Sequence, residues 1–250
     1  MADNWRMRVK KKLPLWMQQA ITEFRYRFMK KTGEGDDLLR IRSFGVYHRR
    51  YDHHEEDPVV YLSFDVEWRE NQYFLQMLDT LKEKKVCAYM FLIGNGIREH
   101  ADIVQRIIDD GHLVGNHTMR HPDLATCTPE QVSQEMADCH QVYREVTGQE
   151  MHRVMRPPYG LIHRPLAKHL HKIGYTVMHW SLHVHDYMKV QPEWEEFETY
   201  YRANLHNGGI ILQHSFSRST AENLGKLIDL CREEGYRFAA AEEYSFFDPQ

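Results

Sequence analysis

From Val59 onward, short apolar runs alternate with amphipathic segments, and this alternation constrains the fold more than any other feature of the sequence. Apolar runs of about four to eight residues bounded by turn residues are typical of buried strands. Apolar residues spaced three or four apart are typical of helices packed on a core. The expected strands are 59–64, 86–92, 112–115, 151–155, 176–180, 209–213 and 238–240, and the expected helices are 73–84, 101–109, 129–146, 164–172, 193–205 and 221–233.

Strands that alternate with helices are joined as parallel strands by crossover helices. About seven such units in a chain of 250 residues have the size of a single α/β barrel. We therefore predict an α/β fold, a distorted (β/α)7-type barrel over residues 51–250, preceded by a basic helical arm over residues 1–50. Catalytic groups in such barrels gather at the carboxyl ends of the strands, so the site is expected there.

Residues 5–31 differ from the rest of the chain because they are rich in Lys, Arg and aromatic residues. Apolar residues recur at helical spacing from Leu15 to Met29, and Pro14 suits the first turn of a helix. Two interpretations remain open. The helix could lie on an anionic membrane surface as a peripheral contact, or it could pack on the domain through its apolar stripe.

Charge, cysteines and apolar runs limit the classes of protein to consider. A formal net charge of −4 argues against nucleic acid as the main partner, and no protein partner is indicated. No run of about 18 apolar residues is present, and the N-terminus lacks the apolar centre of a signal peptide, so we expect an intracellular chain. Four widely spaced cysteines favour reduced, buried thiols over disulfides: Cys87, Cys127, Cys139 and Cys231.

Carboxylates and histidines follow two of the expected strands. Asp65 and Glu67 come at the end of the first strand, where residues two apart point to the same face. His117 and His121 follow another strand, and histidines four apart lie on one side of a helical turn, close enough to reach one metal ion. A catalytic zinc site usually has three protein ligands, so a third ligand, expected to be a carboxylate, would come from elsewhere. The alternative is a helix start with solvated imidazoles.

Two further strand ends carry polar motifs, RPPYG at 156–160 and ILQH at 211–214. Because all four motifs sit at strand ends, the sequence predicts that they share one site. Simpler interpretations stay open at this stage. Asp65 could cap its strand, Arg156 could form a surface salt bridge, and His214 could be a core histidine with a satisfied hydrogen bond.

In this order the motifs resemble those of the polysaccharide deacetylases of carbohydrate esterase family 4, which share the NodB-homology domain. The resemblance covers about Val59 to Phe247 and rests on His-Thr-x-x-His at 117–121, Arg-Pro-Pro-x-Gly at 156–160 and Leu-x-His at 212–214. Within the family the chain is most similar to the deacetylases of sporulating bacteria that act on peptidoglycan muramic acid in δ-lactam synthesis. The stretches that carry this closer similarity are 115–118, 121–124 and 217–224.

The resemblance implies an enzyme that hydrolyses the N-acetyl amide of an amino sugar in a polysaccharide and releases acetate. The expected substrate is peptidoglycan, through its N-acetylmuramic acid or N-acetylglucosamine. The implied cofactor is a divalent metal ion, Zn²⁺ in the first place, with Co²⁺, Ni²⁺ or Mn²⁺ as alternatives. A cell-wall substrate conflicts with the intracellular location expected from the N-terminus.

The same resemblance implies a role for each motif residue. Its catalytic assignments are Asp65 as general base, His214 as general acid, Arg156 as the residue that orients Asp65, and Asp186 as the residue that tunes the pKa of His214. His117 and His121 would be metal ligands. The expected substrate contacts are Tyr159, Pro158, Trp180 and Leu212, with backbone amides near Tyr159 available to an oxyanion and aromatic faces suited to sugar rings.

The sequence departs from the family pattern at two positions. The commonest first motif has two adjacent aspartates, the second a metal ligand, and Val66 in that place cannot bind metal. Glu67 could supply the third ligand, as in family members with an acid two positions after the base; a weakly held or absent metal is the alternative. His183 stands where the family often has aspartate.

Two other functions are compatible with these features. One is the hydrolysis of a small cyclic amide or ureide in the same barrel, which the expected intracellular location favours. The other is a non-catalytic glycan-binding relative whose metal site has been lost at Val66.

Overall fold

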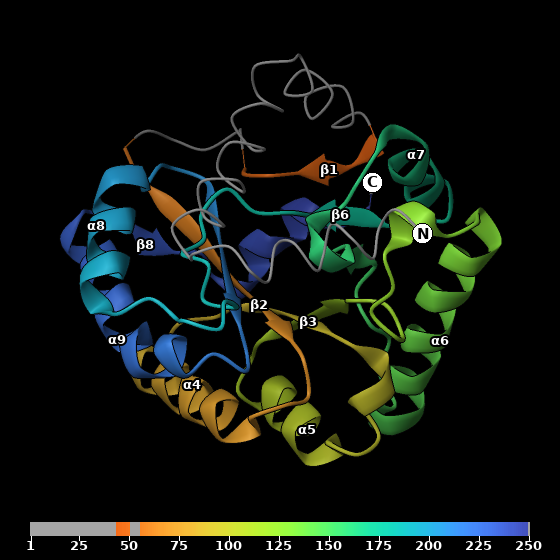
Figure 1. Cartoon of the computed structure of the whole chain (residues 1–250), viewed down its shortest axis with the longest axis horizontal. Coiled ribbons are helices and arrows are strands. Elements are labelled where there is room, and N and C mark those ends of the chain that lie inside the picture. The colour runs from red at the N-terminus through yellow and green to blue at the C-terminus, as the bar shows by residue number, and fades with distance from the viewer. Residues whose placement is uncertain (1–43, 51–55, 250) are drawn as a thin grey trace. The chain divides into compact units, whose positions relative to one another are not determined.

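The computed structural model describes residues 44–50 and 56–249, so most of the predicted N-terminal arm lies outside the described residues. Phe44–Gln250 forms one compact unit. Its centre is a parallel sheet in the order β1-β6-β5-β4-β3-β2-β7, with β8 paired to β2 (Figure 1). The strands are β1 Val46–Tyr47, β2 Val59–Val66, β3 Tyr89–Leu92, β4 Leu113–Asn116, β5 Val154–Met155, β6 Thr176–Met178, β7 Gly209–His214 and β8 Arg237–Phe238.

Helices surround this sheet (Figure 1). They are α4 Asn71–Lys84, α5 Ala101–Asp109, α6 Pro129–Thr147, α7 Arg164–Lys172, α8 Trp194–Asn204 and α9 Arg218–Glu233. Every expected strand and helix is present, and α5 and α7 have the predicted bounds. Thr128 caps α6 through its side chain, which accepts a hydrogen bond from Gln131 N–H. The predicted alternation of strands and helices is therefore confirmed.

The sheet curls into a barrel that is not closed by a continuous ladder. Within the described ranges, β7 meets the opposite side of the sheet through the isolated bridges Leu182 to Ile211 and Arg49 to Gly209. This arrangement agrees with the predicted distorted barrel. Strand β1 falls within the residues expected to form the arm, because a two-residue strand is too short to show a periodic pattern. The sheet therefore begins before residue 50.

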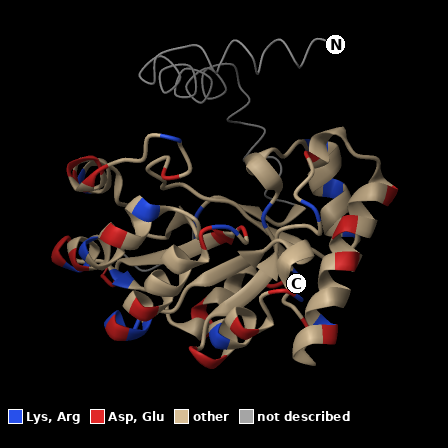
Figure 2. Ribbon diagram, turned by 60° about the horizontal axis from the view of Figure 1, so that its bottom comes forward, with Lys and Arg blue, Asp and Glu red and all other residues tan. Residues whose placement is uncertain are grey.

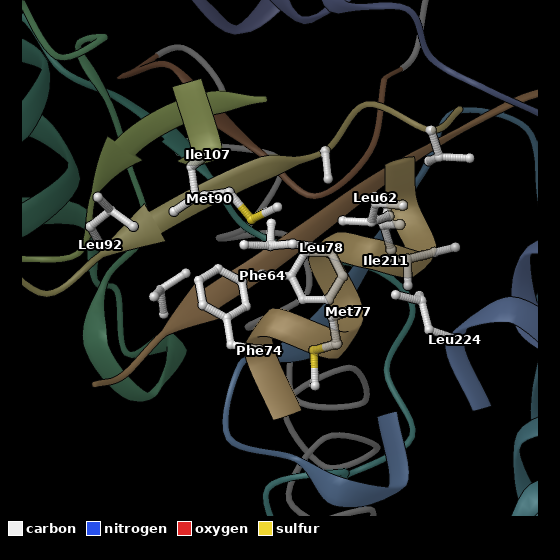
Figure 3. Packing of buried hydrophobic residues seen from close by; sticks show 14 of the residues in the cluster. Leu62, Phe64, Phe74, Met77, Leu78, Met90, Leu92, Ile107, Ile211 and Leu224 are labelled. Atoms are coloured by element: carbon white, nitrogen blue, oxygen red, sulfur yellow. The ribbon is translucent and has the colours of Figure 1, made fainter. Parts of the chain in front are cut away.

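Alternate side chains of β2 lie on opposite faces of the sheet, and this alternation places the site. One set packs among the residues drawn in Figure 3, between the sheet and its helices: Val60, Leu62, Phe64 and Val66. The other set begins with Val59 and Tyr61, which pack in the barrel interior against Tyr89 and Phe91. Ser63 and Asp65 continue this second set toward the carboxyl end. A shift of the strand pairing by one residue would turn the apolar side chains of β2 toward the polar end of the barrel interior. The register of β2 is therefore strongly fixed.

Charged side chains gather on the helices and loops, whereas the strands are largely uncharged (Figure 2). Among the Lys, Arg, Asp and Glu of the chain, Asp65 alone lies within β1–β7 as the structure describes them. No helix in the described ranges is long and apolar enough to span a membrane. The four cysteines, all in described positions, are not in disulfides; Cys139 and Cys231 are buried, but Cys87 and Cys127 are only partly buried, contrary to prediction.

Candidate active site

Asp65 lies at the centre of the site, at the carboxyl end of β2, where its register partner on β7 is His214. Its Oδ1 accepts a hydrogen bond from Arg156 Nη1 at 2.9 Å, and its Oδ2 lies 3.6 Å from His117 Nε2. Burial acts to raise the pKa of Asp65, but the charges of His117, Arg156 and His214 oppose it and the net pKa is lowered. The side chain is therefore a carboxylate at neutral pH.

Arg156 follows β5 and is fully buried, so the alternative of a surface salt bridge is wrong. Besides Asp65, its guanidinium donates to Ser63 Oγ at 2.7 Å and to the carbonyl oxygen of Met178 at 2.9 Å. The guanidinium carbon lies 4.3 Å from the centroid of the Phe91 ring. These contacts fix Arg156 in one orientation. Loss of either partner of this buried pair would cost about 3–5 kcal/mol, because it leaves an uncompensated charge.

His117 is buried just beyond β4, and its hydrogen bonds define its tautomer. Its Nδ1 lies 2.8 Å from the carbonyl oxygen of Arg156, which can only accept, so Nδ1 carries the proton. Nε2 then has a lone pair and no hydrogen-bond partner among the described residues. Burial lowers the pKa of His117, which keeps the imidazole neutral. A neutral imidazole with an unpaired lone pair is the form that binds a metal ion.

His121 lies beside His117, with 4.8 Å between the ring centroids, but not for the predicted reason. The chain here is a loop and not a helical turn, since Thr118 (φ 68) and His121 (φ 60) are both left-handed. The loop is held by His121 N–H, which donates to Thr118 Oγ1 at 2.9 Å. Burial, with a smaller contribution from His117, lowers the pKa of His121 to about 4, so this imidazole is neutral too.

Gly115 in β4 allows the histidine loop to start so close to the barrel interior. A Cβ at this position would lie 2.7 Å from the Tyr89 ring and 2.8 Å from both the Phe91 ring and the Val154 carbonyl oxygen. Such contacts are too short for any other residue, so the glycine lets β4 pass close to these two aromatic rings and β5.

Among the described residues, Glu67 does not form a metal-binding group with His117 and His121. Its carboxylate pairs with Arg69 at 3.0 Å, just after β2. Within residues 44–50 and 56–249, no three His, Cys, Asp or Glu side chains are arranged to hold a metal ion. The chemistry of the donors nevertheless fits a divalent ion in part, because two neutral imidazoles lie together and one of them faces the Asp65 carboxylate.

His214 ends β7 and forms a tightly bonded pair with Asp186, as the resemblance implied. Its Nδ1 lies 2.7 Å from Asp186 Oδ1, and its backbone N–H donates to Oδ2 at 2.9 Å. The Thr220 hydroxyl donates to the same Oδ2 at 2.6 Å. Burial acts to lower the pKa of His214, but the charge and hydrogen bond of Asp186 outweigh it and the net pKa is raised. His214 is thus suited to donate a proton near neutral pH.

Tyr159 and Trp180, two of the expected substrate contacts, lie at the mouth. The Tyr159 ring centroid is 4.7 Å from that of His121, and the side chain is 64% exposed. Trp180 is half-buried and stacks on His179 at 4.0 Å. A Cβ at Gly160, whose φ is 66, would lie 2.4 Å from the Trp180 ring. Glycine therefore allows the Tyr159 turn to lie directly against the tryptophan.

The other two expected contacts are buried. Pro158 begins the short 3₁₀ helix Pro158–Gly160, and Leu212 is 2% exposed within β7. Sequence reasoning also missed residues that support the site. Ser63 could have been noticed because it precedes Asp65 by two residues on the same face, whereas Thr220 on α9 carries no local signal of its contact with Asp186.

The sequence profile of the polysaccharide deacetylase family matches residues 52–178, so the chain belongs to the polysaccharide deacetylase family. The chain is 29% identical over 192 residues to the peptidoglycan-N-acetylmuramic acid deacetylase PdaA of Bacillus subtilis, which covers 76% of this chain and 73% of that protein. The solved structure of B. subtilis PdaA, a family 4 carbohydrate esterase, superposes with a TM-score of 0.74 at 28% identity over 82% of this chain and 87% of that one.

Two solved structures from Bacillus anthracis are also similar. A family 4 carbohydrate esterase matches with a TM-score of 0.69 and 31% identity, covering 86% of this chain and 92% of that one. A pseudoenzyme of the same family matches with a TM-score of 0.69 and 25% identity, covering 77% and 66%. The fold thus occurs in enzymes and in a pseudoenzyme, so the site residues must decide between the two classes.

Proposed function

We propose that the protein hydrolyses the N-acetyl amide of an amino sugar in peptidoglycan and releases acetate. One observation carries the proposal: Asp65 and His214 are register partners on adjacent strands, one held as a carboxylate and the other with a raised pKa. Two groups whose pKa values are pushed apart in one site form an acid–base pair. The relatives named as deacetylases support the substrate class.

In this mechanism Asp65 accepts a proton from the water that attacks the amide carbonyl carbon. Arg156 holds the Asp65 carboxylate in place through its 2.9 Å hydrogen bond. His214 gives a proton to the nitrogen as the carbon–nitrogen bond breaks, and Asp186 fixes the imidazole so that Nε2 carries that proton. The products are acetate and the free amine of the sugar.

Enzymes of this family are in general metal-dependent. His117 and His121 would hold the ion, for which Zn²⁺ is our first expectation and Co²⁺, Ni²⁺ or Mn²⁺ are alternatives. When bound, such an ion polarises the amide carbonyl and acidifies water. Glu67 would have to leave Arg69 to become a third ligand, so a two-histidine or weakly held ion is the alternative.

At the mouth, we assign substrate contact to Tyr159 and Trp180. The exposed Tyr159 ring and the Trp180 ring flank the entrance, where their faces suit sugar rings. The Tyr159 N–H is assigned to the oxyanion. Pro158 and Leu212, the other two expected substrate contacts, are both buried.

Acetate release from purified peptidoglycan tests the proposal. Asp65→Asn and His214→Ala should each lower kcat by about 10²–10⁴, the usual contribution of a general base or acid. Asp102→Asn on α5 and His152→Ala are matched controls on exposed positions and should keep wild-type rates. Wild-type rates in both site variants would contradict the proposal. Release from small cyclic amides but not from glycan would favour the alternative hydrolase, and glycan binding without release would favour a non-catalytic relative.

A further inference from the structure

Two histidines that the mechanism does not use lie side by side, next to Trp180. His48 follows β1 and His179 follows β6, and these two strands are neighbours in the parallel sheet. The Nδ1 atoms of the two rings lie 3.1 Å apart, and the ring centroids lie 4.6 Å apart. Neither histidine belongs to the four motifs at the strand ends. Those motifs therefore do not account for the pair.

The hydrogen bonds of the pair define which nitrogens carry protons. Burial lowers the pKa of His48 to about 4, and burial with a smaller contribution from His48 lowers the pKa of His179 to about 3, so both imidazoles are neutral at neutral pH. His179 Nε2 lies 3.0 Å from the carbonyl oxygen of Gly160, whereas its Nδ1 lies 3.5 Å from that of Trp180. Only the first distance is that of a normal hydrogen bond, and a carbonyl oxygen can only accept, so Nε2 carries the proton. His179 Nδ1 is then an acceptor, and His48 Nδ1 donates to it.

His179 in this way bonds to a strained turn at the mouth of the site. Tyr159 and Gly160 have φ of 60 and 66, so two consecutive residues are left-handed. Within the turn, Gly160 N–H donates to the carbonyl oxygen of Pro157 at 3.0 Å. The Tyr159 side chain is 64% exposed. The hydrogen bond from His179 to the Gly160 carbonyl, together with the packing of Gly160 against Trp180, therefore holds the turn.

His179 also contacts two other groups of the site. The Trp180 ring stacks on its imidazole with an interplanar angle of 8°. Its backbone carbonyl oxygen accepts a hydrogen bond from Arg156 Nη2 at 3.2 Å. Because this second contact is made by the backbone, a change of the His179 side chain leaves it in place. The effect of the imidazole on the turn can therefore be tested separately from the hydrogen bonds that hold Asp65.

We propose that His48 and His179 are positioning residues that hold the Tyr159 N–H where the oxyanion forms. The inference rests on the proposed function, which assigns that N–H to the oxyanion. His48 orients the ring of His179, and His179 fixes the Gly160 carbonyl, so the backbone at Tyr159 keeps one orientation. An oxyanion donor is effective because it is already in place when the charge develops, and a shift of about 1 Å can lower the rate roughly 100-fold.

Acetate release from peptidoglycan by the full-length chain tests the proposal. His179→Phe keeps an aromatic ring beside Trp180 but cannot donate to Gly160. This variant should lower kcat about tenfold, less than the loss of a whole oxyanion donor, and should keep KM within about twofold of the wild type, because the Tyr159 N–H acts in the transition state. His179→Gln can place an amide N–H near the position of Nε2 and should restore kcat to within about threefold of the wild type. His152→Phe, at an exposed position, is the matched control and should keep the wild-type rate.

His48→Leu tests the outer member of the pair. This variant removes the donor to His179 Nδ1 and should lower kcat about threefold. Adding His48→Leu to His179→Phe should lower kcat no further, since the two residues act through one series of hydrogen bonds.

Hydrogen exchange of the backbone amides tests the positioning without using activity. In His179→Phe the Gly160 N–H should exchange at least about tenfold faster than in the wild type, because the turn has lost its bond to His179. The amides of β2 should exchange at the wild-type rate, which separates this local effect from a general loss of stability. His179→Gln should restore the protection of the Gly160 N–H.

Three outcomes decide between the inference and the proposed function. Wild-type kcat in His179→Phe, or an equal loss in His179→Phe and His179→Gln, would overturn the inference and leave the proposed function standing. No acetate from the wild-type chain would overturn the proposed function, and exchange of the Gly160 N–H would then decide whether the pair positions the turn. Faster exchange in His179→Phe but not in His179→Gln would support this role, and unchanged exchange would overturn it. If His179→Phe does not fold, His48→Leu gives the same two readouts.

Discussion

His117 and His214 both lie beside Asp65, His117 fully buried and His214 with 12% of its side chain exposed, yet their pKa values shift in opposite directions. Each has its Nδ1 at hydrogen-bond distance from an oxygen, 2.8 Å for His117 and 2.7 Å for His214. The oxygen belongs to a neutral carbonyl in the first case and to the Asp186 carboxylate in the second. Burial therefore lowers the pKa of His117, whereas Asp186 overcomes burial and raises the pKa of His214.

The backbone also differs between the side of the site that carries His117 and the side that carries His214. His214 lies in a regular strand and its partner Asp186 is held by Thr220, so protein contacts alone fix it. The histidine loop contains two non-glycine residues in left-handed conformations, Thr118 and His121, which the backbone does not favour, and the loop that carries Asp186 contains one, His185. The comparison teaches that protein contacts satisfy the polar atoms of His214 and Asp186, whereas His117 presents an unpaired Nε2 in a loop with two left-handed residues.

The largest expected effect is on metal affinity, which should depend on His117 and His121 and not on His214. His121→Ala and His117→Ala each remove one imidazole donor and should weaken Zn²⁺ binding at least about 100-fold, more than the loss of an outer-shell partner. His214→Ala and the exposed control His152→Ala should leave it unchanged. Equilibrium dialysis against Zn²⁺ measures this, with urea unfolding to confirm that each variant is folded. Equal loss in His214→Ala would show that the division between the two sides is wrong.

A smaller effect should follow from loss of the Asp186 charge. Asp186→Asn removes the charge that raises the pKa of His214, whereas burial, which lowers that pKa, remains. The pKa of His214 should therefore fall below its wild-type value. His214 must be protonated to act as the acid, and activity is lost as pH rises through its pKa. The alkaline limb of the kcat–pH profile should therefore move to lower pH, with kcat lowered roughly tenfold at neutral pH.

The control for that profile is Asp109→Asn at the end of α5, an exposed position that is none of the assigned site residues. Its alkaline limb should coincide with that of the wild type. An unmoved limb in Asp186→Asn would mean that the group titrating in the profile is not His214.

The sequence predicted the fold well because buried strands and amphipathic helices each have their own period. It also predicted Asp65, since a carboxylate at the tip of an apolar strand has to face the barrel mouth or the core. Strand β1 was missed because its two residues pair with β6, about 130 positions away, and a local pattern cannot show that partner.

The site was predicted in position more than in detail. Spacing brought His117 and His121 together correctly, but the same spacing fits a helical turn and a left-handed loop. The ion pair of Glu67 with Arg69 competes with the ligand role that the strand period allowed. Asp186 came only from the resemblance and Thr220 not at all, because their contacts join segments 28 and 34 residues apart along the chain.

The smallest expected effect tests the backbone strain at Tyr159, whose ring packs beside His121. Tyr159 has φ 60 and ψ 5, a left-handed conformation that costs a non-glycine residue about 1–2 kcal/mol. Tyr159→Gly removes that cost, and the greater freedom of glycine when unfolded takes back about 0.5–1 kcal/mol. We therefore expect the free energy of unfolding to rise by up to about 1 kcal/mol.

On the acid side Tyr187→Gly, where φ is not positive, should lower the free energy of unfolding by at least about 0.5 kcal/mol. Urea unfolding of both variants measures whether each change raises or lowers the free energy of unfolding. If both variants lose stability equally, the left-handed backbone at Tyr159 is no more strained than the backbone at Tyr187.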